Sequence, residues 1–256
     1  MRMRFMLALG VAVLAASVFA STAAASHSWG GYHWARTSNP FTVKLGDNLT
    51  GSWPSYLSTT SSDWSKSTVL DTTIVPGGSR QKRCRATAGQ DEICNGYYGN
   101  NGWLGVAQIW LSGGSHITQG TVKVNDTYFD TPTYNTPEWR NLVMCQEVGH
   151  TFGLDHQDEN FNNANLGTCM DYTNDPSSNQ HPNSHDYEEL EIIYAHLDSF
   201  TTVGAAAPTG AAHSDNAAPI AVERSDHISS STITETFADG SKRVTHILWA
   251  LGTSRS

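Results

Sequence analysis

The sequence has little charge, and positive charge is especially scarce. Charged residues make up 15% of the 256 residues, and 15 Lys and Arg face 24 Asp and Glu, for a formal net charge of −9. A basic surface of the kind that binds nucleic acid is therefore excluded. Hydrophobic residues make up 38% of the chain and include eight Trp and nine Tyr, enough to build a buried core.

Long apolar runs are also scarce, and the one present is at the N-terminus. Arg2 and Arg4 precede the apolar stretch 5–19, and small residues follow at 21–26. A membrane span needs about 20 apolar residues, whereas this order of segments is typical of a cleaved secretion signal. We expect a signal peptide at 1–25, a secreted or periplasmic protein, and no membrane span.

Cysteine is rare, and no C-x-x-C motif is present. The sequence contains four cysteines, which allow three disulfide pairings. Export permits disulfides, and the wide spacing argues against metal ligation by these thiols. Cys84 and Cys94 flank a short polar loop, so we expect them to pair and to leave Cys145 with Cys169.

Hydrophobic periodicity predicts an α/β fold. A strand at 39–45, a helix at 53–64 and a strand at 67–75 suggest a βαβ unit, followed by an irregular region at 77–101. Strands at 104–111 and 117–124 flank Gly113-Gly114. A helix capped by Thr136 runs toward Gly153, and a last helix starts near Ser184.

These elements predict a twisted mixed sheet of about five strands, an active-site helix and a small C-terminal lobe. We expect the main domain at 27–200 and an Ala/Gly/Pro-rich linker at 201–218. A tail at 219–256 would contain a β-hairpin around Asp239-Gly240.

The helix end and the turn after it carry the residues of a metal site. Gln146 and His150 lie one helical turn apart, so both side chains can reach one ion, with Glu147 at its flank. Gly153 ends the helix, and His156 can then return to the same point. This set leaves a coordination position open for water, which Glu147 can polarise as a general base.

Glu147, His150, Gly153 and His156 match the signature H-E-x-x-H-x-x-G-x-x-H. The chain thereby resembles the metzincin zinc peptidases, most closely their matrixin branch. Cys169–Tyr172 is similar to the Met-turn of that family. The resemblance covers about residues 32–198.

The resemblance implies a zincin-like fold and a secreted endopeptidase with one catalytic Zn²⁺ that cleaves a protein or peptide substrate. Met170 would form the apolar floor under the metal, and Tyr172 would stabilise the transition state. The strand 104–111 would be an antiparallel edge strand that aligns an extended peptide.

Gln146 stands where the signature has its first histidine. A neutral amide oxygen is a poorer zinc ligand than imidazole, and three interpretations follow. Gln146 is a weak ligand; or it only hydrogen-bonds the metal-bound water, with Tyr172 recruited as a ligand; or the domain is a secreted binding protein without catalysis. As a separate option, cleavage after Ser26 would expose His27 as an N-terminal copper chelator.

Overall fold

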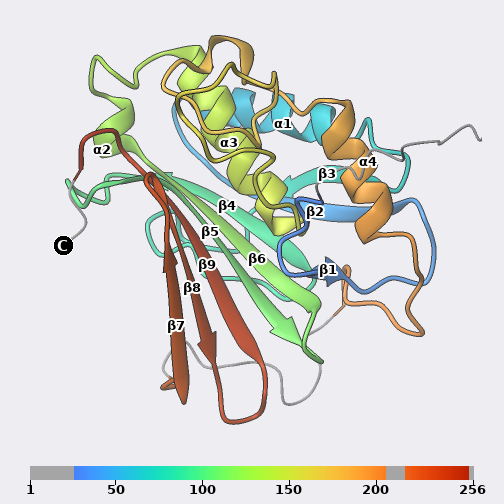
Figure 1. Ribbon diagram of the computed structural model, residues 1–256. Coiled ribbons are helices and arrows are strands. Elements are labelled where there is room, and N and C mark those ends of the chain that lie inside the picture. Colours follow the sequence, from blue (N-terminus) through green and yellow to red (C-terminus); the bar gives the residue numbers. More distant parts are fainter. Residues whose placement is uncertain (1–25, 206–216, 254–256) are drawn as a thin grey trace, which may run out of the picture.

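The computed structural model describes residues 26–205 and 217–253, where nine strands form one mixed sheet (Figure 1). The strand order is β3-β2-β4-β6-β5-β9-β8-β7, and β1 pairs with β6. The strands are β1 His33–Trp34, β2 Phe41–Asn48, β3 Leu70–Pro76, β4 Gln90–Gly96, β5 Trp103–Ser112, β6 His116–Asn125, β7 Ala221–Asp226, β8 Ser230–Thr236 and β9 Lys242–Trp249. The helices are α1 Trp53–Trp64, α2 Asp126–Phe129, α3 Pro137–Thr151 and α4 Ser184–Ile193, with a 3₁₀ turn at Pro176–Ser178. The expected signal peptide (1–25) and most of the expected linker (206–216) lie outside the described residues.

The expected α/β class is confirmed, but the expectation of about five strands is wrong. Strand β4 falls in the region expected to be irregular. It lies between β2 and β6 and is buried along almost its whole length, so it lacks the polar alternation of a half-exposed strand. The other additions are the short β1 and the three C-terminal strands.

The first βαβ unit forms as expected. Strand β2 pairs in parallel with β3, and α1 connects them. The apolar side chains of α1, Trp53, Leu57 and Trp64, are buried. Helices α1, α3 and α4 lie on one face of the sheet (Figure 1), so the core lies between that face and the helices.

Strands β5 and β6 form the expected antiparallel hairpin, but β5 is not an edge strand. Its second side pairs antiparallel with β9 over Trp103–Leu111. The prediction failed because the periodicity of one strand does not reveal whether a distant strand will cover its free edge. Among the described strands, β7 and β3 stand at the two ends of the sheet.

Helix α3 has the expected boundaries. The Thr136 hydroxyl accepts a hydrogen bond from Trp139 N at 3.3 Å, Pro137 occupies the first turn, and the helix ends at Thr151. Gly153 follows with φ of +94°, and a Cβ there would lie 1.9 Å from Tyr32 O. Glycine is therefore required at this turn for both backbone conformation and space.

The C-terminal tail forms the expected hairpin, β8 and β9, around Asp239-Gly240. It is not a separate unit, because β9 continues the main sheet at β5. Strand β7 is exposed along its length.

Both expected disulfides are present, between Cys84 and Cys94 and between Cys145 and Cys169. Among the described residues, none of the helices has the length and apolar character needed to cross a bilayer.

Candidate metal centre

The last two turns of α3 bring Gln146, Glu147 and His150 to the inner face of the sheet, and all three are buried. Met170 packs under this part of the helix, because Gly149 has no side chain. A Cβ at Gly149 would lie 2.8 Å from Met170 Sδ. The resemblance implies that Met170 forms the apolar floor of the site, and its position under α3 is compatible with that role.

The turn after the helix returns His156 to His150, as the spacing predicts. The two ring centroids are 4.7 Å apart. Tyr172 packs on the other side of His156 at a centroid distance of 4.1 Å, and Trp29 packs against His150 at 5.4 Å. One helix and two loops therefore enclose the pair of imidazoles.

A third imidazole comes from strand β9. The ring of His246 lies 4.1 Å from that of His150 and 4.9 Å from that of His156, centroid to centroid. One nitrogen of each histidine lies within 4.8 Å of the other two. His246 was not expected from the sequence. Its signal is a histidine on the same face as Val244 and Leu248 in an alternating strand, a pattern that a buried core histidine shares.

In each of the three rings an acceptor faces Nδ1, and Nε2 is buried without a partner. His150 Nδ1 is 2.8 Å from Leu154 O. His156 Nδ1 is 3.3 Å from the Asp155 carboxylate, but the two do not form a hydrogen bond. His246 Nδ1 is 3.3 Å from Glu147 Oε2. The three Nε2 atoms have no hydrogen-bond partner. An acceptor on one ring nitrogen and a free second nitrogen are the arrangement of metal-bound histidines, so these residues fit a metal ion.

Gln146 is tied to the Met-turn segment. Its Nε2 donates a hydrogen bond of 2.9 Å to Cys169 O, while Oε1 is buried without a partner. The neighbouring Cys145–Cys169 disulfide joins the same two segments. Gln146 therefore holds the floor of the site, and its free oxygen remains available as a ligand.

Glu147 and Tyr172 complete the polar groups near the histidines. Glu147 is fully buried against β5, where a Cβ at Gly105 would lie 2.5 Å from Glu147 Oε1. The Tyr172 hydroxyl is buried without a hydrogen-bond partner. Burial raises the pKa of the Tyr172 hydroxyl well above its usual value, so it stays protonated and can donate a hydrogen bond.

Burial also sets the charge of the other groups. It raises the pKa of Glu147 well above its usual value, against the opposing influence of His156. Burial and the neighbouring imidazoles lower the pKa of His150 and His246 well below the usual value. The pKa of His156 is raised, because the carboxylates of Asp155 and Glu159 outweigh its burial. Neutral His150 and His246 keep a lone pair for a metal at neutral pH.

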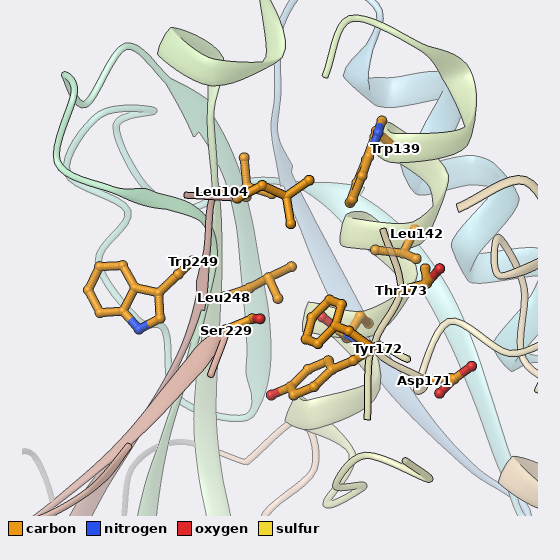
Figure 2. Close-up of a pocket in the computed structure, with 12 residues that line it drawn as sticks. Leu104, Trp139, Leu142, Asp171, Tyr172, Thr173, Ser229, Leu248 and Trp249 are labelled. Atoms are coloured by element: carbon orange, nitrogen blue, oxygen red, sulfur yellow. The ribbon is translucent and has the colours of Figure 1, made fainter. Parts of the chain in front are cut away.

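An apolar pocket opens beside the histidines, between α3 and the C-terminal hairpin (Figure 2). Leu142 and Trp139 line its helix side, and Leu104 and Leu248 line its strand side. Gln146 and Tyr172 also line it. The pocket is narrow and bounded mainly by apolar side chains of α3 and the strands.

Comparison with protein-family models finds no family that matches this chain, and comparison with curated proteins finds no relative. The resemblance to metzincins therefore depends on the motif residues alone.

Proposed function

We propose that this protein is a secreted, zinc-dependent metalloendopeptidase related to the metzincins. The observation that carries the proposal is the group of three buried imidazoles, each with Nδ1 facing an acceptor and Nε2 free. Without an ion, three buried and unpartnered nitrogens would cost several kcal/mol of stability. An ion bound among them removes that cost.

Zinc suits this donor set because it prefers nitrogen ligands and is held by three histidines in other catalytic sites. His150, His156 and His246 would hold it, with the Gln146 oxygen beside them. When bound, zinc supplies a Lewis acid that polarises a carbonyl and lowers the pKa of a water molecule.

The protein's own groups supply the rest of the chemistry. Glu147 is the general base, because its carboxylate lies among the histidines, with Oε2 3.3 Å from His246 Nδ1. The protonated Tyr172 hydroxyl donates a hydrogen bond to the oxyanion that develops on the scissile carbonyl.

Secretion is part of the same proposal. The N-terminal sequence has the order of a cleaved signal, and both pairs of cysteines are bridged. Disulfides persist in oxidising compartments.

A second candidate function is a secreted binding protein that holds zinc without catalysis. The observation that favours it is the covered edge of β5, where β9 takes the place of a peptide. In that case the metal would be structural.

The test compares the zinc-loaded wild type with Glu147→Gln on unfolded casein. The wild type should bind zinc at the histidines and cleave, and Glu147→Gln should cleave about 10²- to 10⁴-fold more slowly because it lacks the base. Both proteins are assayed at saturating zinc, because Glu147 contacts the proposed ligand His246 and its replacement would also weaken zinc binding. Zinc-loaded wild type that leaves casein intact would favour the binding protein.

A further inference from the structure

The C-terminal hairpin (β8 and β9, Ser230–Trp249) lies where an extended peptide would have to bind. Strand β9 pairs antiparallel with β5, the strand next to the metal-bearing helix, and His246 stands opposite Ala107. Any peptide that paired with this edge in the same direction would place its own residue at that position. In the described conformation His246 of β9 occupies the position opposite Ala107.

The hairpin also closes the site to solvent. The exposed fraction is 0% for Glu147 and His150, 2% for His246, 3% for Tyr172 and 8% for His156. A substrate carbonyl has no route to such a centre while β9 stays in place.

The contact between His246 and Glu147 has two effects. The carboxylate faces Nδ1 of the ring at 3.3 Å, which orients Nε2 toward the other two histidines. The same contact engages the group that would take a proton from water. The docked hairpin therefore supplies the third histidine ligand. At the same time it engages Glu147, the proposed general base, through His246.

We infer that the described conformation is a latent form, in which the C-terminal hairpin is an internal competitor of the substrate. This inference rests on the proposed peptidase function. Cleavage is then carried out by the fraction of molecules in which β9 has separated from β5. In that form His150, His156 and the Gln146 oxygen would hold the ion without His246. Zinc stabilises the closed form, because His246 is a ligand only while the hairpin is docked.

A disulfide lock between β5 and β9 tests the inference in the full chain. Gln108 and Thr245 are register partners, and their side chains are joined by a hydrogen bond of 3.0 Å. The double variant Gln108→Cys/Thr245→Cys would tie the hairpin down. Both positions neighbour Ala107 and His246 in sequence, so their side chains project from the opposite face of the sheet.

The matched control is a lock inside the hairpin. Glu235 and Arg243 are partners between β8 and β9 and form an ion pair at 2.6 Å. Glu235→Cys/Arg243→Cys adds a disulfide of the same type but leaves β9 free to separate from β5. Wild type treated with the same reductant controls for the native disulfides.

Two quantities are measured, the rate at which a chelator removes zinc and the rate of casein cleavage. We expect the β5–β9 lock to slow both at least 10-fold, with recovery on reduction, and the control lock to change neither. A locked protein that releases zinc and cleaves at wild-type rates overturns the inference. A lock that slows zinc release in a protein that never cleaves supports closure and removes the peptidase function.

A loosened hairpin gives an independent result should the lock fail to form. Leu248 is 5% exposed and lines the pocket on β9, so Leu248→Asp places a charge in an apolar contact that only the docked strand makes. Faster zinc release and faster cleavage than in the wild type support the inference. Slower cleavage, with zinc saturated, overturns it.

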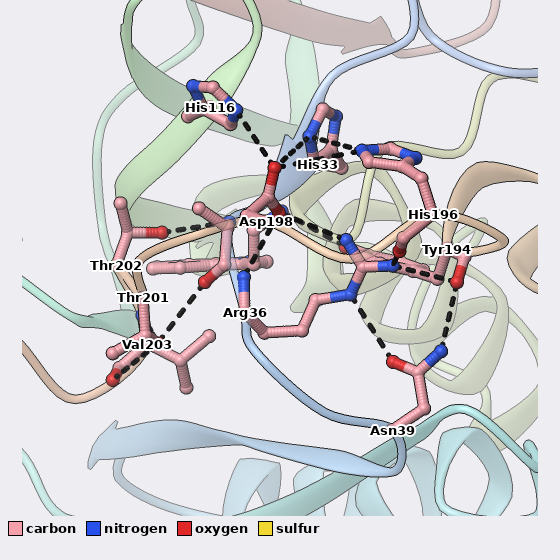
Figure 3. Close-up of polar contacts among 12 residues, drawn as sticks. His33, Arg36, Asn39, His116, Tyr194, His196, Asp198, Thr201, Thr202 and Val203 are labelled. Carbon is pink, nitrogen blue, oxygen red and sulfur yellow. Dashed lines mark hydrogen bonds and ion pairs between the residues drawn. The ribbon is translucent and has the colours of Figure 1, made fainter.

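A second cluster of ligands carries a separate proposal. Asp198 lies at the centre of three imidazoles, from β1, from the start of β6 and from the loop after α4 (Figure 3). Its Oδ1 is 3.9 Å from His33 Nε2, 3.3 Å from His116 Nε2 and 3.8 Å from His196 Nε2. The Nε2 atoms of His33 and His196 are 3.1 Å apart.

One ligand atom each of His33, His196 and Asp198 lies within 4.8 Å of the other two, close enough for one ion to draw them together. Zinc–ligand bonds of about 2.0–2.1 Å place neighbouring ligand atoms about 3.4 Å apart. Arg36 Nη1 donates a hydrogen bond of 3.1 Å to the other carboxylate oxygen of Asp198. The carbonyl oxygen of Gly31 lies 2.8 Å from His33 Nδ1. Both contacts orient the ligand atoms as outer-shell partners do.

We propose that His33, His196 and Asp198 form a second zinc site that ties the loop after α4 to the sheet, with His116 as a partner of the Asp198 carboxylate. His33→Ala/His196→Ala should lose one of two bound zinc ions per chain, measured by metal analysis after dialysis, and the cobalt-loaded protein should lose the corresponding visible absorption. The matched control is His181→Ala, which removes another partly exposed histidine paired with an aspartate. Equal metal content in the wild type and the double variant would overturn this site.

Discussion

Replacing His246 with alanine tests which side chain stands in for the missing first histidine of the motif. Loss of an outer-shell partner lowers metal affinity 10- to 100-fold, and loss of a ligand should cost at least the upper end of that range. We therefore expect His246→Ala to weaken zinc binding at the histidine centre by about 100-fold or more. Gln146→Ala should cost less, because its amide already bonds Cys169 O.

The affinity loss has a predictable effect on thermal stability. At a free zinc concentration of 1,000 times the wild-type Kd, binding stabilises the wild type by about 4 kcal/mol. With a 100-fold weaker Kd the same zinc contributes about 1.4 kcal/mol. The difference of about 2.7 kcal/mol corresponds to roughly 5–10 °C in the zinc-induced rise of Tm for a chain of this size.

The assay is competition with a chromogenic chelator, followed by thermal unfolding with and without zinc. His181→Ala serves as the control for loss of a histidine whose side chain pairs with Asp63 and is not part of this cluster. Unchanged zinc affinity in His246→Ala would refute the reasoning, as would a larger loss in Gln146→Ala.

Three further predictions concern the frame around the site. Burial raises the pKa of Asp91 to about 8, so the buried carboxyl is protonated in the folded protein while it ionises in the unfolded chain. The stabilising effect of this group is complete below the unfolded pKa near 4 and is lost as pH rises toward 8. In urea unfolding at pH 5, 6 and 7, the free energy of unfolding should fall by about 1.4 kcal/mol per pH unit because of this group. Asp91→Asn should lack that contribution. Cys145→Ala/Cys169→Ala opens a loop of sequence separation 24 and should lower the free energy of unfolding by about 3 kcal/mol, checked by denaturant titration. Gly153→Ala should lower Tm and zinc affinity together, because a Cβ would lie 1.9 Å from Tyr32 O; unchanged zinc binding in a folded variant would contradict the role of this turn.

Local elements followed closely from the sequence. The boundaries of α1 and α3 and the hairpin turn at Gly113-Gly114 depend on side chains within a few residues of each other. Strand β4 was missed because Asp91 and Glu92 are buried in it, where an alternating pattern would place apolar side chains.

The sequence by itself determined the part of the site built within one helix and its stop. The positions of Glu147, His150 and His156 follow from helical rise and from a glycine that permits the return of the chain. Only the tertiary structure decided that His246 joins them and that β9 covers the edge of β5. The physical reason is that helical geometry relates neighbours along the chain, whereas strand pairing depends on which sheet edge is free, a property of the whole fold.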